Sequence, residues 1–237
     1  MKVLITGASK GIGRAIAHEL FRAGHDVLIV ARHDEALRDA AEQIKKASPG
    51  VDAQVLHCVC DVGEREQIVA LRKYCDEAGF APDMLVANAG IFLKGSLVAG
   101  DAKDLDEMLR VNVFGVFHLV QVFIDQLRSS SAPRVVIIGS TADREPYKFG
   151  PFYGVSKWAL RGFAVNLRKE LQADKIGVTL ISPGGTLTDL WADRTLPPKR
   201  LLDPGDVGRL IVALCGLSDQ AVVEEIVLRP ILGDYHQ

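Results

Sequence analysis

A tyrosine, a lysine and a serine in the second half of the chain have a spacing that would allow them to act together on a substrate. Tyr153 lies four residues before Lys157 in "GPFYGVSKWAL", and Ser140 lies thirteen residues before Tyr153 in "VVIIGSTA". In a helix, side chains four residues apart lie on one face. A neighbouring ammonium group stabilises a phenolate and lowers the tyrosine pKa, which is about 10 in water, so that the phenol can serve in acid/base catalysis. An isolated Tyr and Lys at this spacing more often lie on a helix surface. The rest of the chain has to decide between a surface pair and a catalytic pair.

Length and composition favour one substantial core. The chain has 237 residues with 48% hydrophobic side chains, and no linker rich in Pro, Gly or Ser divides it, so we expect a single domain over residues 1–237. The 28 basic and 30 acidic residues nearly balance, which argues against a nucleic-acid partner. No apolar run approaches the roughly 20 residues that span a bilayer, and the first residues leave no room for a signal peptide before a glycine turn. A cytoplasmic protein without a membrane partner is predicted.

The cysteines and histidines show no metal-ligand spacing. None of Cys58, Cys60, Cys75 and Cys215 forms a CxxC pair, and the alternation of the first two along an apolar run is typical of buried thiols in a reducing compartment. The six histidines form no HExxH pattern. We therefore predict structural cysteines and no metal site.

Short runs of Val, Ile and Leu alternate with helical patterns from end to end. Strands are expected in "KVLIT", "DVLIVA", "AQVLHCV", "DMLVANA", "RVVIIGS", "GVTLIS" and "EEIVLR", and helices over residues 11–23, 34–47, 63–78, 104–128, 153–173 and 205–216. Uninterrupted apolar strands are typical of a parallel sheet that is covered on both faces. The pattern predicts a Rossmann-like α/β fold, a doubly wound parallel sheet of about seven strands with helices on both faces.

One irregular segment follows the sixth predicted strand. Residues 183–204 combine Pro and Gly with Trp191 and several leucines. In a doubly wound sheet, ligands bind beyond the carboxyl ends of the strands, where this segment begins. A substrate-covering loop and a plain surface excursion both fit its composition.

A glycine-rich turn follows the first predicted strand. In "GASKGIG", the residues Gly7, Gly11 and Gly13 stand directly before a helix. Glycines let the backbone approach a ligand closely, and the helix N-terminus offers free N–H groups to a pyrophosphate. Because no Lys-Ser/Thr pair follows Gly13, a P-loop for nucleoside triphosphates does not fit. The turn predicts a dinucleotide site.

The end of the second predicted strand indicates which dinucleotide is bound. An NAD site usually carries an Asp or Glu there, whereas this chain has Ala31 and Arg32. A cation at this position can pair with a 2′-phosphate, and Lys10 in the glycine turn can supply a second positive charge. We therefore predict NADP(H), with two merely solvated cations as the alternative.

Six short motifs occur in a fixed order along the chain. They are "TGASKGIG", "NAG" at 88–90, "VNV" at 111–113, "IIGS", "YGVSK" and "PGGTLT" at 183–188. With them the chain resembles the short-chain dehydrogenase/reductase family over essentially its whole length. The resemblance implies an oxidoreductase that acts on a small-molecule carbonyl or alcohol substrate.

The resemblance also implies roles for four residues. Ser140 would hydrogen-bond the substrate carbonyl, and Tyr153 would transfer the proton. Lys157 would hold the nicotinamide ribose and lower the tyrosine pKa, and Asn112 would keep a water in a proton relay. The chemistry agrees, because negative charge grows on the carbonyl oxygen as hydride reaches the carbon, and donors placed there lower the barrier.

Further positions match the family's cofactor site. Asp61 would lie beside the adenine, Asn88 would stabilise the central sheet and the adenosine pocket, and Thr188 would bind the nicotinamide carboxamide. Asp61 and Thr188 can instead cap helices, the former one that begins near Gly63, and Asn88 can be a turn residue. The full set expected at the cofactor is Gly7, Ser9, Lys10, Gly11, Ile12, Gly13, Arg32, Asp61, Val62, Asn88, Ala89, Gly90, Tyr153, Lys157, Pro183, Gly184, Thr186 and Thr188.

These residues predict an NADPH-dependent enzyme that reduces a ketone to a secondary alcohol with Tyr153 as the proton donor. An NADP-dependent secondary-alcohol dehydrogenase, a 3-oxoacyl thioester reductase and a non-catalytic NADPH sensor are the alternatives. The last strand lacks the Val-Asp-Gly-Gly segment usual in 3-oxoacyl-carrier-protein reductases, which argues against that role. Six apolar side chains fit the lining of a substrate pocket and fit the core or a subunit contact equally well: Tyr147, Phe149, Phe152, Leu187, Leu190 and Trp191.

The two longest predicted helices favour self-association. The helix over residues 153–173 carries more apolar side chains than one buried stripe requires, namely Trp158, Leu160, Phe163, Ala164 and Leu167. Members of the family that the chain resembles often associate through the helices that match 104–128 and 153–173. A homodimer or homotetramer is expected, with the residues after Leu232 at a subunit contact.

Overall fold

The computed structural model describes residues 1–148, 150–191, 195–197 and 199–234. Seven parallel strands form one sheet in the order β3-β2-β1-β4-β5-β6-β7. They are β1 (Lys2–Thr6), β2 (Asp26–Ala31), β3 (Val55–Val59), β4 (Met84–Ala87), β5 (Arg134–Ile138), β6 (Gly177–Pro183) and β7 (Glu225–Leu228). The predicted Rossmann-like fold is confirmed.

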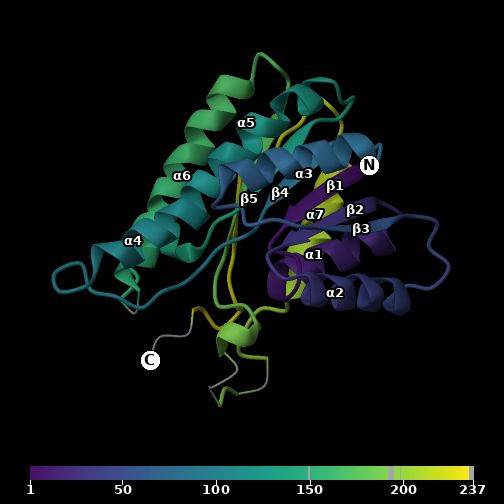
Figure 1. The fold of residues 1–237 in the computed structure, drawn as a ribbon. Coiled ribbons are helices and arrows are strands. Elements are labelled where there is room, and N and C mark those ends of the chain that lie inside the picture. Colours follow the sequence, from purple (N-terminus) through teal and green to yellow (C-terminus); the bar gives the residue numbers. More distant parts are fainter. Residues whose placement is uncertain (149, 192–194, 198, 235–237) are drawn as a thin grey trace.

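Helices cover both faces of this sheet (Figure 1). They are α1 (Gly11–Arg22), α2 (Asp34–Ala47), α3 (Arg65–Glu77), α4 (Ala102–Leu109), α5 (Gly115–Arg128), α6 (Pro151–Leu171) and α7 (Pro204–Cys215). Three short turns of helix complete the described elements: η1 (Arg110–Phe114), η2 (Thr141–Asp143) and η3 (Asp189–Trp191). Helices α1, α2 and α7 pack on one face, and α3, α5 and α6 on the other.

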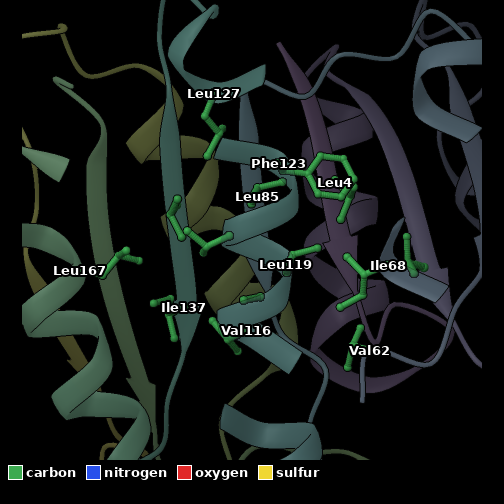
Figure 2. Close-up of a cluster of buried hydrophobic side chains, with 14 of the residues drawn as sticks. Leu4, Val62, Ile68, Leu85, Val116, Leu119, Phe123, Leu127, Ile137 and Leu167 are labelled. Carbon is green, nitrogen blue, oxygen red and sulfur yellow. The ribbon is translucent and has the colours of Figure 1, made fainter. Parts of the chain in front are cut away.

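The alternation of side chains along each strand divides the core into two layers. In β1, Leu4 points to the layer under α5, while Val3 and Ile5 point to the layer under α1. Figure 2 shows the first layer, in which Phe123 of α5 lies near Leu4. Because both faces are buried, the strands need apolar side chains at every position, which explains their unbroken Val/Ile/Leu runs.

The chain changes direction across the sheet at β1. This strand lies between β2 and β4, so the connection after β1 leaves toward one side and the connection after β4 toward the other. Such a switch point opens a crevice at the carboxyl ends of the strands. The Thr6 hydroxyl accepts hydrogen bonds of 3.1 Å from the backbone N–H groups of Asn88 and Ala89, which ties the two strand ends together.

Two helices differ from their predicted form. The helix expected over 104–128 consists of α4, a π turn and α5, because the Gly115 N–H donates to the Arg110 carbonyl and so closes an i→i+5 turn. Helix α6 begins at Pro151, where the fixed φ of proline suits the first helical position.

One stretch of the described residues, Ala102–Arg128, is long and apolar enough by length and composition to cross a membrane. The sequence analysis expected no such stretch. In the fold, α5 buries Leu119, Phe123 and Leu127 against the sheet, and the buried core helices of globular proteins pass the same test. Core packing accounts for the buried part of this apolar segment, while Phe114 and Phe117 stay exposed.

Candidate active site

The glycine turn after β1 packs directly against the loop after β4. Gly7 has a φ of +66°, and a Cβ there would lie 2.7 Å from the Ala89 Cα. A Cβ at Gly13 would lie 2.4 Å from the Gly7 carbonyl oxygen and 2.5 Å from Asn88 Nδ2. That amide donates to the carbonyl oxygens of Thr6 and Gly7 at 2.9 and 3.1 Å. The turn therefore has no room for side chains, and Asn88 holds it to the central sheet.

A cleft of about 630 Å³ runs along the carboxyl ends of the strands from this turn. The N-terminus of α1 opens onto it and presents backbone N–H groups, as a pyrophosphate requires. Most of the predicted cofactor residues line it, namely Gly7, Ser9, Lys10, Gly11, Ile12, Gly13, Arg32, Asp61, Val62, Asn88, Ala89, Gly90, Tyr153, Lys157 and Thr188. The remaining three, Pro183, Gly184 and Thr186, line an adjoining cavity together with Thr188. The cleft therefore fits an extended dinucleotide.

The polar residues at the adenosine end differ from expectation in two respects. The Asp61 carboxylate accepts from the Gly63 N–H at 2.9 Å, but α3 begins only at Arg65, so this carboxylate closes a turn and does not cap the helix. The Lys10 ammonium lies 3.0 Å from the Asp189 carboxylate in an exposed ion pair, while the exposed Arg32 lines the cleft at the end of β2. Exposed ion pairs contribute about 0 to 1 kcal/mol to stability, so a bound phosphate can displace Asp189 from Lys10.

Ser140, Tyr153 and Lys157 meet where the two cavities join. Tyr153 lines both cavities, Ser140 lines the smaller one, and the Ser140 hydroxyl acts to lower the pKa of the Tyr153 phenol. Lys157 is buried one helical turn further along α6, with its Nζ 5.5 Å from the centre of the Tyr153 ring. The same Nζ donates to the Ile138 carbonyl at 3.0 Å, at the end of β5. The predicted i, i+4 pair therefore faces the serine across the cleft.

Burial sets the protonation of this pair. It raises the pKa of Tyr153 to about 12, with the Ser140 hydrogen bond acting in the opposite direction. It lowers the pKa of Lys157 to about 8, against the charge of Asp143. The expectation that Lys157 lowers the Tyr153 pKa does not hold in this structure, because removal from water disfavours the phenolate more strongly. At neutral pH Tyr153 is a phenol with a proton to donate, and Lys157 is mostly an ammonium ion.

Asn112 is buried in the π turn and joins three elements. Its Nδ2 donates to the Ile91 carbonyl and to the Ser156 hydroxyl, each at 3.0 Å, and its Oδ1 accepts from the Ile91 N–H at 2.8 Å. Both amide hydrogens are thus engaged with protein groups. The side chain fixes the loop after β4 against α6, and its part in a water relay stays a prediction.

The adjoining cavity of about 200 Å³ lies beyond Tyr153. Of the side chains expected to line it, Tyr147 and Trp191 do so. Phe152 is buried instead, and its ring packs against Gly95, where an added Cβ would lie 2.5 Å from the ring. Leu187 is 62% exposed. Phe149 and the Leu190 side chain lie outside the described residues.

Phe92 and Asp234 are among the residues of this cavity that were not predicted from the sequence. Phe92 packs edge-on against Tyr153 and Tyr147, with ring centres 5.4 and 6.1 Å apart, and its place just after the "NAG" motif was an available signal. Asp234 pairs with Arg229 and approaches the Gly185 N–H at 3.4 Å. It had been expected at a subunit contact, and no local pattern marks it as a pocket residue.

Comparisons with known proteins agree with this geometry. The family model for the short chain dehydrogenase matches residues 1–198, and the chain belongs to this family. It is 28% identical over 228 residues to an uncharacterized oxidoreductase of Staphylococcus saprophyticus, covering 96% of both chains. These relationships define the protein as an NAD(P)-dependent oxidoreductase.

Solved structures resemble the fold closely. An alcohol dehydrogenase from the archaeon Thermococcus sibiricus, complexed with 5-hydroxy-NADP, superposes with a TM-score of 0.89 at 26% identity, over 100% of this chain and 99% of that chain. L-sorbose reductase from Gluconobacter frateurii, complexed with NADPH and L-sorbose, superposes with a TM-score of 0.86 at 25% identity, over 97% and 95% of the two chains.

The close packing of the glycine turn yields a test of the cofactor cleft. In Gly13→Ala the new methyl group displaces Asn88 or the Gly7 carbonyl, so the turn loses its alignment with the pyrophosphate. One lost hydrogen bond to a charged group costs about 1.5 to 3 kcal/mol, so NADPH binding should weaken by about tenfold or more in a fluorescence titration. Gly162→Ala, whose Cβ meets nothing within 4 Å, is the matched control and should bind as the unmodified protein does.

Proposed function

We propose that the protein is an NADPH-dependent reductase that converts a ketone to a secondary alcohol, with Tyr153 as the proton donor. The observation that carries the proposal is the position of Tyr153 in the wall shared by both cavities, with Ser140 in the wall of the smaller one. A substrate carbonyl in the smaller cavity can reach both hydroxyl groups while its carbon faces the larger cleft. Asn112, Ser140, Tyr153 and Lys157 form the proposed catalytic set.

The residues of this chain would manage the proton. Reduced nicotinamide, when bound, supplies a hydride to the carbonyl carbon. The two electrons of the C=O π bond move to oxygen, and the Tyr153 phenol gives its proton to that oxygen. Ser140 donates a hydrogen bond to the same oxygen and stabilises its growing charge. The Lys157 ammonium, one turn away, would stabilise the phenolate that remains, and a proton from solvent would then restore the phenol.

Arg32 supports the choice of NADP(H) over NAD(H). It is exposed at the cleft wall at the end of β2, where a carboxylate for a ribose 2′-hydroxyl would otherwise stand. A guanidinium there suits a 2′-phosphate. Lys10 is the second cation at this wall, released from Asp189 when the phosphate binds.

Reversing the charge at this position tests the cofactor preference. Arg32→Asp removes the phosphate partner and introduces repulsion, so NADPH binding should weaken by about 10- to 100-fold while NADH binding improves. Isothermal titration with both cofactors measures the two affinities. Arg38→Asp, on the exposed side of α2, is the control for a change of net charge, and equal NADPH affinities in both variants would contradict the assignment.

Removing the phenol tests the chemistry. NADPH consumption by the protein is followed at fixed pH across ketones, diketones, quinones, keto sugars and acyl thioesters, with Tyr153→Phe in parallel. The variant should lose turnover by a factor of about 10² to 10⁴ and keep its NADPH affinity, because only the proton donor is absent. Full activity of Tyr153→Phe on an accepted ketone would exclude it as the donor.

The same assay separates the alternatives. Turnover of acyl thioesters alone would favour the 3-oxoacyl reductase, and faster oxidation of alcohols with NADP⁺ would favour the dehydrogenase direction. NADPH binding without turnover of any compound in either direction would favour a sensor.

We further propose a cytoplasmic homodimer or homotetramer. The π turn η1 and helices α5 and α6 expose large apolar side chains, including Phe114, Phe117 and Trp158, of which Trp158 is 50% exposed. Contiguous exposed apolar surface of this kind typically marks an interface. A second copy of the chain would bury it.

Gel filtration tests this assembly. The protein should elute at the mass of two or four chains, and Trp158→Glu, which places a charge in the apolar surface, should shift the elution toward one chain. Asp125→Asn, at an 83% exposed side chain on α5, is the control. Elution of the unmodified protein at 25.7 kDa would contradict the proposal.

A further inference from the structure

A carboxylate lies completely buried three residues after the proposed catalytic serine. Asp143 is 0% exposed and ends the short helical turn η2, which Ser140 caps. Its Oδ2 accepts from the Ser140 N–H at 3.4 Å and from the Ser182 hydroxyl, and its Oδ1 accepts from Arg144 Nε at 2.8 Å. A buried charge is stable only with such partners, and burying it still costs several kcal/mol.

The carboxylate is part of a charged network that joins four elements. Arg144 also donates to the Ser182 hydroxyl at 3.1 Å and lies 3.5 Å from the Glu225 carboxylate of β7. Arg161 of α6 pairs with the same carboxylate at 3.2 Å. Turn η2, strands β6 and β7, and helix α6 are therefore tied around Asp143, on the side of the site away from the cofactor cleft.

The surrounding backbone is shaped to admit the carboxylate. A Cβ at Gly139 would lie 2.6 Å from Asp143 Oδ2 and 3.1 Å from Ser182 Oγ, so only glycine fits between β5 and the serine. The Ser140 hydroxyl accepts from the Ala142 N–H at 3.2 Å, and it acts to lower the pKa of the Tyr153 phenol. The orientation of this hydroxyl thus depends on the turn that Asp143 closes.

A neutral side chain would suffice to cap such a turn, since Asn or Ser also satisfies backbone N–H groups. The negative charge has a further effect, because Asp143 and Lys157 are both buried beside the end of β5. The Lys157 Nζ donates to the Ile138 carbonyl, and the Asp143 carboxylate lies against the next residue, Gly139. Asp143 raises the pKa of Lys157 against burial, and it raises that of Tyr153 as well. The first effect keeps Lys157 an ammonium ion, whereas the second makes the Tyr153 phenol a weaker acid.

We propose that Asp143 is a positioning residue, whose carboxylate fixes the turn that aims the Ser140 hydroxyl at Tyr153 and serves as the counter-charge of the buried Lys157 ammonium. The proposal rests on the proposed reductase function for its kinetic consequences. Its electrostatic part concerns Asp143 and Lys157 alone.

Several charged and titratable groups surround the Asp143 carboxylate and contribute to the pH dependence of the site. They are Arg144 on η2, the Ser182 hydroxyl from β6, and Tyr153 and Lys157 from α6, with Glu225 of β7 and Arg161 of α6 reached through Arg144. Tyr147 adds a further phenol beside Tyr153. Among these groups, Lys157 has a pKa of about 8 and titrates in an accessible range.

Asp143→Asn keeps the shape and removes the charge. In protein labelled with ¹³C at lysine Cε, the Lys157 resonance, assigned with Lys157→Arg, should titrate near pH 8 in the unmodified protein. In Asp143→Asn its midpoint should fall by about 1 pH unit, as for loss of one nearby opposite charge. Asp125→Asn should leave the midpoint in place. Equal midpoints in Asp143→Asn and the unmodified protein would overturn the counter-charge.

The pH profile of ketone reduction supplies the second readout. Reduction requires the Lys157 ammonium, so the rate falls as the pH rises through its midpoint, and in Asp143→Asn this fall should begin at lower pH. In Asp143→Ala, which removes the side chain that closes the turn, the kcat should drop at the pH optimum with little change in KM, because Ser140 loses its orientation. An unchanged kcat at the optimum would overturn the positioning role. If the unmodified protein reduces no ketone, the NMR midpoints still decide the counter-charge, so the two proposals fail separately.

Asp143→Asn removes the carboxylate that pairs with the Arg144 guanidinium, and loss of this ion pair can destabilise the protein. The double variant Asp143→Asn/Arg144→Gln removes both charges and is measured in the same way. A Lys157 midpoint below that of the unmodified protein is again expected, and an equal or higher midpoint would overturn the proposal.

Discussion

The close approach of two backbone segments at the middle of the sheet is the constraint on which the site depends. The glycine turn after β1 and the loop after β4 touch through Gly7, Gly13 and Asn88, with contacts that admit no additional methyl group. This contact places the N-terminus of α1 over the switch point. Ile91, in the loop after β4, is in turn hydrogen-bonded to Asn112. The cleft for a dinucleotide and the wall that carries the reactive groups therefore share one rigid junction.

Burial determines the pKa shifts of Tyr153 and Lys157. Lys157 and Tyr153 are placed on α6 where water is largely removed, and the resulting shifts keep the phenol protonated and bring the ammonium near its titration range. The protein offsets the cost of these buried groups with fixed partners: the Ile138 carbonyl for Lys157, and Ser140 for Tyr153. A site built in this way holds its groups in place before any substrate arrives, which lowers the reorganisation needed during reaction.

The sequence predicted the features that depend on local pattern. The buried strands, the glycine turn and the Tyr153/Lys157 spacing each carry a signal within a few residues, and all of them occupy the expected elements. The direction of the Tyr153 pKa shift was wrong, because burial is a property of the packed site and leaves no mark on the spacing. The place of Asp234 was likewise missed, since its approach to Gly185 joins residues 49 positions apart.

The π turn between α4 and α5 makes the position of Asn112 depend on the number of residues in this segment. It closes with an i→i+5 bond and so contains one residue more than an α-helical turn, while the flanking helices keep their apolar faces toward the core. The inward placement of Asn112 is thus encoded by a count of residues. Removal of one residue from this segment would restore a regular helix, leave α4 and α5 in phase, and turn the amide away from Ile91. At this point one residue beyond an α-helical turn, which hydrophobic periodicity does not reveal, places an amide between the loop after β4 and α6.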